Sequence, residues 1–316
     1  MNWKHLISVL MTGLVLACSN KEDAGIEDPL PPPKPVDELG TGWVKLQPGI
    51  GKFHDIHFVN DSTGYACGKT VARTTDRGNN WISFPLTDDQ PYYELYSTDP
   101  AHCWVVGQNK LSITTDSGRN WTFIPLSVGS AGVSDIFFFD NNNGMIAGKG
   151  GLFRSSDGGH HWTTVVGSQF ISDVSFIDQQ NGWYIDEKKV FHTQDAGVSF
   201  TEQHAFPDSL TRIQFISAQT GWLSDVKGAI YRTIDGGLTW DKVKTLDEKM
   251  PYALQFFSQD HGFILFSEAV YELKGGTVTK VLSLPNNPLS DIQFTDVNHG
   301  WAVSPFNNGS VYRYVK

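Results

Sequence analysis

One short pattern returns along this chain: an aspartate, a glycine-containing turn and an aromatic residue. Its clearest copy is TIDGGLTW at 233–240. Aspartate can accept hydrogen bonds from the backbone that follows it, and glycine takes positive φ without steric cost, so each copy predicts a tight turn between two strands. Recurrence at similar spacing indicates an array of similar units rather than one hairpin. The copies carry Asp76, Asp116, Asp157, Asp195 and Asp235, and four of them end in Trp81, Trp121, Trp162 and Trp240.

A second motif precedes each turn and fixes the number of units. Its copies read DIHF, ELYS, DIFF, DVSF, RIQF, ALQF and DIQF, and they begin near residues 55, 94, 135, 173, 212, 253 and 291. The second position is always aliphatic and the fourth is phenylalanine in six of seven copies, which is typical of a half-buried strand. Four short strands in each unit of 38–41 residues predict an all-β fold. The expected architecture is a seven-bladed β-propeller of four-stranded antiparallel blades.

The two ends of the repeat array complement each other. The last unit stops after the strand at 311–314, without a fourth strand, whereas the strand-like segment 43–46 stands alone before the first unit. We therefore expect the N-terminal strand to complete the last blade of a domain at 41–316, which removes an open sheet edge. A β-sandwich does not need such equal spacing, and an open solenoid needs atypical caps at both ends.

Residues 1–40 are expected to lie outside this domain. A charged start before the apolar run 6–16 is typical of an export signal, which we place at 1–17. The run ends in LVLAC, which resembles the lipobox of bacterial lipoproteins and implies lipid attachment at Cys18. The alternative is an ordinary signal peptide with an incidental cysteine. The acidic, proline-rich segment 18–40 predicts an extended tether.

The start of this tether also bears on location. The charged residues directly after Cys18 resemble a short export tag of some Gram-negative lipoproteins. This resemblance implies a lipid anchor in the outer membrane and favours surface display over an anchor that faces the periplasm.

The aspartate turn resembles the Asp-box, or BNR repeat, of sialidases and related propellers. The whole unit is most similar to photosystem II assembly/stability factor-like propellers, over residues 43–315. The resemblance implies that the turn aspartates and tryptophans are structural and lie away from the usual binding face. It indicates the fold more strongly than the function, because one fold hosts many activities. Blade six departs from the pattern, since 271–277 has neither aspartate nor tryptophan.

The sequence offers no catalytic constellation. Sialidases hold a carboxylate with an arginine cluster, but here the arginines recur at one repeat position beside the turn, which favours a structural role. The histidines show no close pair at metal-ligand spacing, and no phosphate loop or nucleophile elbow is present. We therefore predict no cofactor, no metal and no enzymatic activity, with a glycoside hydrolase as the alternative. The recurring arginines are Arg73, Arg154, Arg232 and Arg313.

The face opposite the turns is the candidate binding surface. Its strand-two to strand-three loops carry Lys69, Lys110, Lys149, Lys188 and Lys227. Its inter-blade loops carry Tyr92, Tyr93, Phe170, Phe206 and Tyr252. Exposed aromatics of this kind are typical of interface or sugar-stacking anchors, although some of them are expected only to pack on neighbouring blades. First strands begin with Asp55, Glu94, Asp135, Asp173 and Asp291. We expect lysines and acids to ring the channel mouth, either as solvated ion pairs or as a rim that orients a partner.

Charge and cysteine content limit the partners and the chemistry. A formal net charge of −10 argues against nucleic acid and against direct binding of anionic membrane. We predict a monomer that binds a protein partner, with a glycan as the alternative ligand. Cys67 and Cys103 are assigned to opposite ends of neighbouring second strands, farther apart than the ~7 Å that a disulfide allows, so we predict two free thiols.

Overall fold

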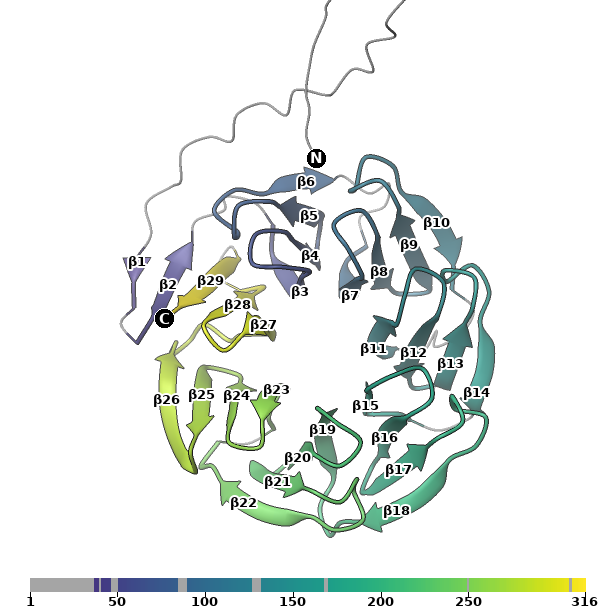
Figure 1. Cartoon of the computed structure of the whole chain (residues 1–316). Helices are drawn as coiled ribbons and strands as arrows, with labels where there is room; N and C mark the ends of the chain where they lie inside the picture. The colour runs from purple at the N-terminus through teal and green to yellow at the C-terminus, as the bar shows by residue number, and fades with distance from the viewer. Residues whose placement is uncertain are drawn as a thin grey trace, which may run out of the picture. The chain divides into compact units, whose positions relative to one another are not determined.

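The computed structural model describes residues 37–39, 41–46, 51–84, 90–126, 132–167, 170–248, 250–306 and 309–316. Their regular structure consists of strands. Seven antiparallel sheets stand around a central channel as the blades of a propeller (Figure 1). The predicted fold class is confirmed. The export signal, Cys18 and most of the tether lie outside the described residues, within which no helix is long and apolar enough to cross a membrane.

The blades follow one another in chain order, and the first strand of each lies next to the channel (Figure 1). Blade one contains β3 (Phe53–Phe58), β4 (Gly64–Gly68), β5 (Val71–Thr74) and β6 (Ile82–Phe84). Blade two contains β7 (Tyr92–Ser97), β8 (Cys103–Gly107), β9 (Lys110–Thr114) and β10 (Thr122–Pro125). Blade three contains β11 (Val133–Phe138), β12 (Gly144–Gly148), β13 (Gly151–Ser155) and β14 (Thr163–Gly167). Blade four contains β15 (Asp173–Phe176), β16 (Gly182–Asp186), β17 (Lys189–Thr193) and β18 (Thr201–Ala205).

The remaining blades continue the same order. Blade five contains β19 (Leu210–Phe215), β20 (Gly221–Asp225), β21 (Ala229–Thr233) and β22 (Asp241–Thr245). Blade six contains β23 (Ala253–Ser258), β24 (His261–Phe266), β25 (Ala269–Lys274) and β26 (Thr277–Ser283). Blade seven contains β27 (Asp291–Asp296), β28 (His299–Ser304) and β29 (Ser310–Val315), joined by β1 (Asp37–Glu38) and β2 (Trp43–Leu46) from the other end of the chain.

The last blade is completed by the N-terminal strand, as the sequence predicts. β2 pairs antiparallel with β29, with Trp43 opposite Tyr314 and Leu46 opposite Val311. The Trp43 side chain is buried, with its ring centroid 5.3 Å from that of Tyr314. One detail differs from the expectation, because Asp37 pairs with Lys45 and β1 adds a fifth strand to the blade. The tether therefore contributes two residues to the sheet.

The core lies between neighbouring blades rather than within one. In blades one, three, five, six and seven, the fourth-position phenylalanine of the first strand stacks on the second-strand aromatic residue of the preceding blade. The Phe58 and Trp301 ring centroids lie 3.5 Å apart, and those of Phe215 and Trp183 lie 3.6 Å apart. Second strands are almost fully buried between these layers. Cys67 and Cys103 are buried there as free thiols, which confirms the prediction for both.

Candidate binding surface around the central channel

The five aspartate turns share one hydrogen-bond pattern. In the turn of blade five, the Thr233 hydroxyl and the Thr239 N–H donate to Asp235 Oδ1 at 2.8 and 2.9 Å. The Trp240 indole then donates to the Gly237 carbonyl at 3.1 Å. In blade four, the hydroxyl and N–H of Ser199 lower the pKa of the Asp195 carboxyl to about 2. These carboxylates are occupied within their own turns, as a structural role requires. Equivalent bonds surround Asp76, Asp116 and Asp157.

The turns also connect adjacent blades. The second-strand indoles of Trp104, Trp183 and Trp301 donate to turn carbonyls of the next blade at 2.8, 3.0 and 3.0 Å. The recurring arginines make similar connections: Arg154 donates to the Ala196 carbonyl at 3.1 Å and Arg313 to Asn79 Oδ1 at 3.1 Å. Arg232 reaches Asp260 of blade six at 3.7 Å. These contacts support a structural role for the arginine position.

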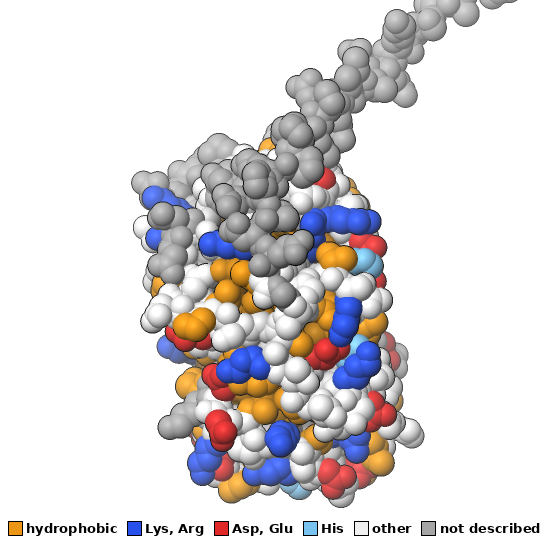
Figure 2. Space-filling model, turned by 90° about the vertical axis from the view of Figure 1, so that its left-hand side faces the viewer, with side chains coloured by type: hydrophobic (Ala, Val, Ile, Leu, Met, Phe, Trp, Pro, Cys, Tyr) orange, Lys and Arg blue, Asp and Glu red, His pale blue; other side chains and the backbone are white. Residues whose placement is uncertain are grey.

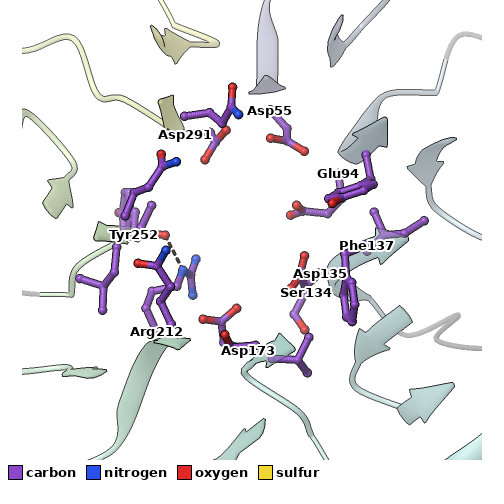
Figure 3. A pocket seen from close by; sticks show the side chains of 18 of the residues that line it. Asp55, Glu94, Ser134, Asp135, Phe137, Asp173, Arg212, Tyr252 and Asp291 are labelled. Carbon is purple, nitrogen blue, oxygen red and sulfur yellow. Dashed lines mark hydrogen bonds between the residues drawn. The ribbon is translucent and has the colours of Figure 1, made fainter. Parts of the chain in front are cut away.

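The central channel contains a cavity of about 460 Å³, lined by first strands from all seven blades. Five acids point toward one another across it (Figure 3). They are Asp55, Glu94, Asp135, Asp173 and Asp291. The gathering of these acids was predicted from the sequence. Blade five places Arg212 at the same repeat position, and blade six places Ala253 there.

Backbone hydrogen bonds hold several of these acids between two blades. Asp55 accepts from its neighbour Ile56 at 2.7 Å and from Leu95 of blade two at 2.6 Å. Asp173 likewise accepts from Ile213 of blade five at 2.7 Å. The acids therefore connect consecutive first strands.

A second polar layer lies further along the first strands. The Gln293 amide accepts from Phe58 N–H at 2.8 Å and donates to the Phe58 carbonyl at 3.1 Å. Gln255 makes the same pair of bonds with Phe294 of the next blade. Sequence analysis missed this role. The signal was a glutamine at the third motif position of three consecutive blades.

Burial and mutual repulsion make the channel acids hold protons more tightly than usual. Burial raises the pKa of Asp173 and of Asp291 to about 6. Burial and neighbouring acids raise the pKa of Asp55, Glu94 and Asp135 well above the usual range. The neighbouring Asp291 carboxyl contributes to the raised pKa of Asp55, because two acids close together disfavour ionisation of both.

Arg212 is the only lysine or arginine among the residues that the structure shows lining the cavity. Its guanidinium donates to the Tyr252 carbonyl (Figure 3) and to the Thr211 carbonyl, the latter at 2.7 Å. Its positive charge lowers the pKa of Glu94, Asp135 and Asp173 and so partly opposes the effect of burial. The channel is therefore acidic with one built-in cation.

The lysines do not join this ring, so the expected lysine and acid rim is wrong for the described residues. None of the five loop lysines lines the channel cavity, and no ion pair joins one of them to a channel acid. Lys110 is buried; its ammonium donates to the Gln90 carbonyl at 2.8 Å and lies 4.0 Å from the Tyr92 ring centroid. The lysines lie farther from the channel axis than the acids, because their loops follow the second strands whereas the acids are on the innermost strands.

The other lysines meet different partners. Lys227 pairs with Asp208 at 2.8 Å, and Lys188 donates to the Pro207 carbonyl at 2.7 Å. Lys149 is exposed. Lys69 lines a second hollow of about 380 Å³, together with Pro91, Pro305 and Phe306.

The predicted loop aromatics divide into two groups. Tyr92 and Phe206 are buried and so belong to the aromatics that were expected only to pack: the Tyr92 hydroxyl lies 3.1 Å from Ser112 Oγ, and Phe206 packs on the Tyr231 ring. Tyr93, Phe170 and Tyr252 are 43%, 45% and 37% exposed. Tyr93 and Tyr252 line the cavity beside the acids. Phe306, which sequence analysis did not single out, is also exposed.

The side of the molecule shown in Figure 2 lacks this concentration of one charge. The side seen in Figure 2 carries lysine, arginine, aspartate and glutamate intermixed with hydrophobic side chains. The acidic cavity with its two exposed tyrosines therefore differs from this side of the molecule in its charge.

One group of potential metal ligands lies elsewhere. Atoms of Asp61, Asp296 and His299 approach within 4.8 Å of one another, where blades seven and one meet. Asp296 accepts from the Asn298 N–H at 2.7 Å and from His299 Nδ1 at 2.8 Å, and Thr295 donates to Asp61 at 3.2 Å. These bonds account for the arrangement as a turn, and we assign no metal to it.

Comparisons with known proteins agree with the sequence resemblance. The family model of photosynthesis system II assembly factor YCF48 matches residues 40–172. A structure of YCF48 bound to a D1 peptide is 17% identical, with a TM-score of 0.73 over 87% of this chain and 97% of that one. The resemblance to photosystem II assembly-factor-like propellers is confirmed. YCF48 from Cyanidioschyzon merolae is 18% identical, with a TM-score of 0.72 over 87% of this chain and 99% of that one.

More distant neighbours include an enzyme. A virginiamycin B lyase from Staphylococcus aureus, solved with quinupristin, is 13% identical, with a TM-score of 0.70 over 87% of this chain and 99% of that one. At such identities these structures show the fold alone. A comparison with curated protein sequences gives no match.

Proposed function

We propose that this protein is a non-enzymatic binding protein that holds a protein partner at the channel face, in an assembly-factor-like role. The observation that carries the proposal is the pair of exposed tyrosines, Tyr93 and Tyr252, beside an acidic cavity. Exposed tyrosine next to a charged depression is typical of interface hot spots. The similarity to YCF48, a protein whose structure has been solved with a D1 peptide, supports a peptide or protein as the ligand.

The channel chemistry favours binding over catalysis. Asp55 and Asp173 accept backbone N–H groups from adjacent blades, which ties these carboxylates to the architecture of the ring. No nucleophile paired with a general base lines the cavity among the described residues.

A glycan-binding or glycan-cleaving protein is the second candidate. Carboxyls with raised pKa near exposed aromatic rings also occur in glycosidases, where a buried carboxyl acts as general acid. Turnover of an oligosaccharide by the purified protein, lost in Asp173→Asn, would place this candidate first.

The partner is expected in the bacterial envelope. We propose that Cys18 carries a lipid that anchors the domain in the outer membrane, because the preceding residues resemble a lipobox. Membrane fractionation of the parent and of Cys18→Ser tests this location. Equal amounts of both proteins in the outer-membrane fraction would contradict lipid anchoring.

The binding proposal is tested by truncating the two tyrosines. We expect the double variant Tyr93→Ala/Tyr252→Ala to remain folded and to lose a partner that is cross-linked to the parent in envelope extract. A hot-spot tyrosine contributes about 2 kcal/mol or more, or roughly thirtyfold in affinity. Phe123→Ala is the matched control, since Phe123 is 54% exposed on the outer strand β10. Equal partner retention by parent and double variant would contradict the proposal.

A further inference from the structure

We propose that the channel cavity receives a cationic side chain, an arginine or a lysine, from an extended segment of the partner. This inference rests on the proposed function and specifies the chemistry of the partner. Three features support it: the volume of the cavity, the exposed Tyr93 and Tyr252 that line it, and the position of Arg212 among the acids.

The ring of first positions already contains one guanidinium. Arg212 stands among the acids, with its donors directed to the Thr211 and Tyr252 carbonyls and its charge acting on Glu94, Asp135 and Asp173. The protein itself therefore shows that a guanidinium fits between these strands. Guanidinium groups suit such positions because their planar donors match carboxylates and they are more weakly hydrated than ammonium groups.

The opposite sector of the ring has acids without a cation. Asp55 and Glu94 lie across the channel from Arg212, and Asp291 lies beside Asp55 (Figure 3). The Glu94 carboxylate points into the cavity and accepts no hydrogen bond from the described residues. Blade six contributes Ala253 at the next position and so leaves one place in the ring without a charged side chain.

A guest cation would relieve this imbalance. Like charges that are removed from water repel strongly, and an opposite charge within a few ångströms favours their ionised forms. An arginine that enters between Glu94 and the Asp55–Asp291 pair meets carboxylate oxygens on two sides. Such charge complementarity selects cationic partners and rejects acidic ones.

The cavity and its rim fit a side chain carried by a larger molecule. A volume of about 460 Å³ accommodates one long side chain together with water. Tyr93 and Tyr252 line the same cavity and are partly exposed, so their rings can cover the aliphatic stem of a guest lysine or arginine and attract its charge. These aromatic rings would not contribute to the binding of a free metal ion by the acids.

The test compares two peptide probes on the full-length protein. Each probe is a short fluorescent peptide with neutral flanks and a central arginine or, in the control, citrulline, which has similar shape and no charge. Fluorescence polarisation measures affinity. We expect the arginine probe to bind at least about tenfold more tightly than the citrulline probe. Equal affinities would overturn the inference.

Channel variants locate the binding. Glu94→Gln should weaken the arginine probe at least about tenfold, because the amide keeps the shape but loses the charge. Asp241→Asn is the control, since Asp241 is exposed on the outer strand β22. Unchanged affinity in Glu94→Gln, or equal weakening in both variants, would overturn the assignment. Binding of calcium by the parent, lost in Glu94→Gln while the arginine probe fails to bind, would make the cavity a metal site instead.

The two proposals fail in different ways. If the captured partner is lost in Tyr93→Ala/Tyr252→Ala but retained by Glu94→Gln, the channel face binds the partner and the cationic guest is wrong. If the arginine probe binds as expected while the tyrosine variant retains its partner, the cavity chemistry holds and the proposed partner site is wrong.

Discussion

At the residue scale, the glycine that begins a second strand is required by the phenylalanine of the same blade. A Cβ atom on Gly221 would lie 2.7 Å from the Phe215 ring, which folds back over this position. The ring cannot move away, because its other face stacks on Trp183 of the preceding blade. The sequence displays the glycine and the phenylalanine as a recurring pair, but it does not reveal that one residue covers the other.

This contact predicts a large effect from one methyl group. Gly221→Ala should lower the free energy of unfolding by about 1–3 kcal/mol, as expected for overpacking in a dense core. Gly167→Ala is a suitable control, since a Cβ atom there meets only Thr164 Cγ2, at an ordinary 3.4 Å. Denaturant unfolding of the two variants provides the measurement. Similar midpoints for both would show that the phenylalanine ring accommodates the methyl group.

At the element scale, the strands followed directly from the repeat, whereas the connections between blades did not. Alternating aliphatic and polar positions identify first strands because one side faces a neighbouring blade. The links formed by Asp55 and Gln293 join residues far apart in sequence, and their partners are backbone groups that carry no sequence signal. The lysine rim failed for a related reason, since radial distance from the channel depends on how the sheets are arranged.

The glutamine links yield a prediction for neighbouring blades. Gln293→Leu should leave the N–H and carbonyl of Phe58 without their present side-chain partners between blades seven and one. An unsatisfied buried polar group costs about 1–3 kcal/mol, so we expect a lower melting temperature. Gln180→Leu, at an exposed position in a turn of blade four, should have little effect. Equal melting temperatures would indicate that the Phe58 backbone groups find other partners.

At the scale of the whole molecule, closure of the ring was predictable because the surplus strand at one end matched the missing strand at the other. The acidic channel was predictable as well, since one repeat position carries the acids and the ring brings all copies together. The buried state of Tyr92, Phe206 and Lys110 was not predictable, because it depends on packing against elements that the repeat does not specify. The sequence therefore predicted the acidic character of the site but not the contacts that its residues make.

The acid ring also predicts how stability depends on pH. A carboxyl whose folded pKa is raised contributes stability below its unfolded pKa and loses it as the pH rises through the folded pKa. Asp173 and Asp291, with pKa values of about 6, lose their contribution between about pH 4 and 7. Over part of this range His57 acts in the opposite direction, because burial lowers its pKa to about 4. The decisive range is therefore above the usual histidine pKa of about 6.5.

The raised pKa values of Asp55, Glu94 and Asp135 make these acids lose their protons at higher pH than ordinary carboxyls do. We expect the melting temperature to fall as the pH rises above about 6.5, because deprotonation leaves Asp55, Glu94 and Asp135 charged against one another in the channel. The double variant Glu94→Gln/Asp135→Asn should show a shallower fall, since the amides do not ionise, while Asp241→Asn should follow the parent. Scanning calorimetry across this range provides the measurement. A parent melting temperature that stays constant or rises would mean that the channel acids are solvated well enough to ionise without destabilising the propeller.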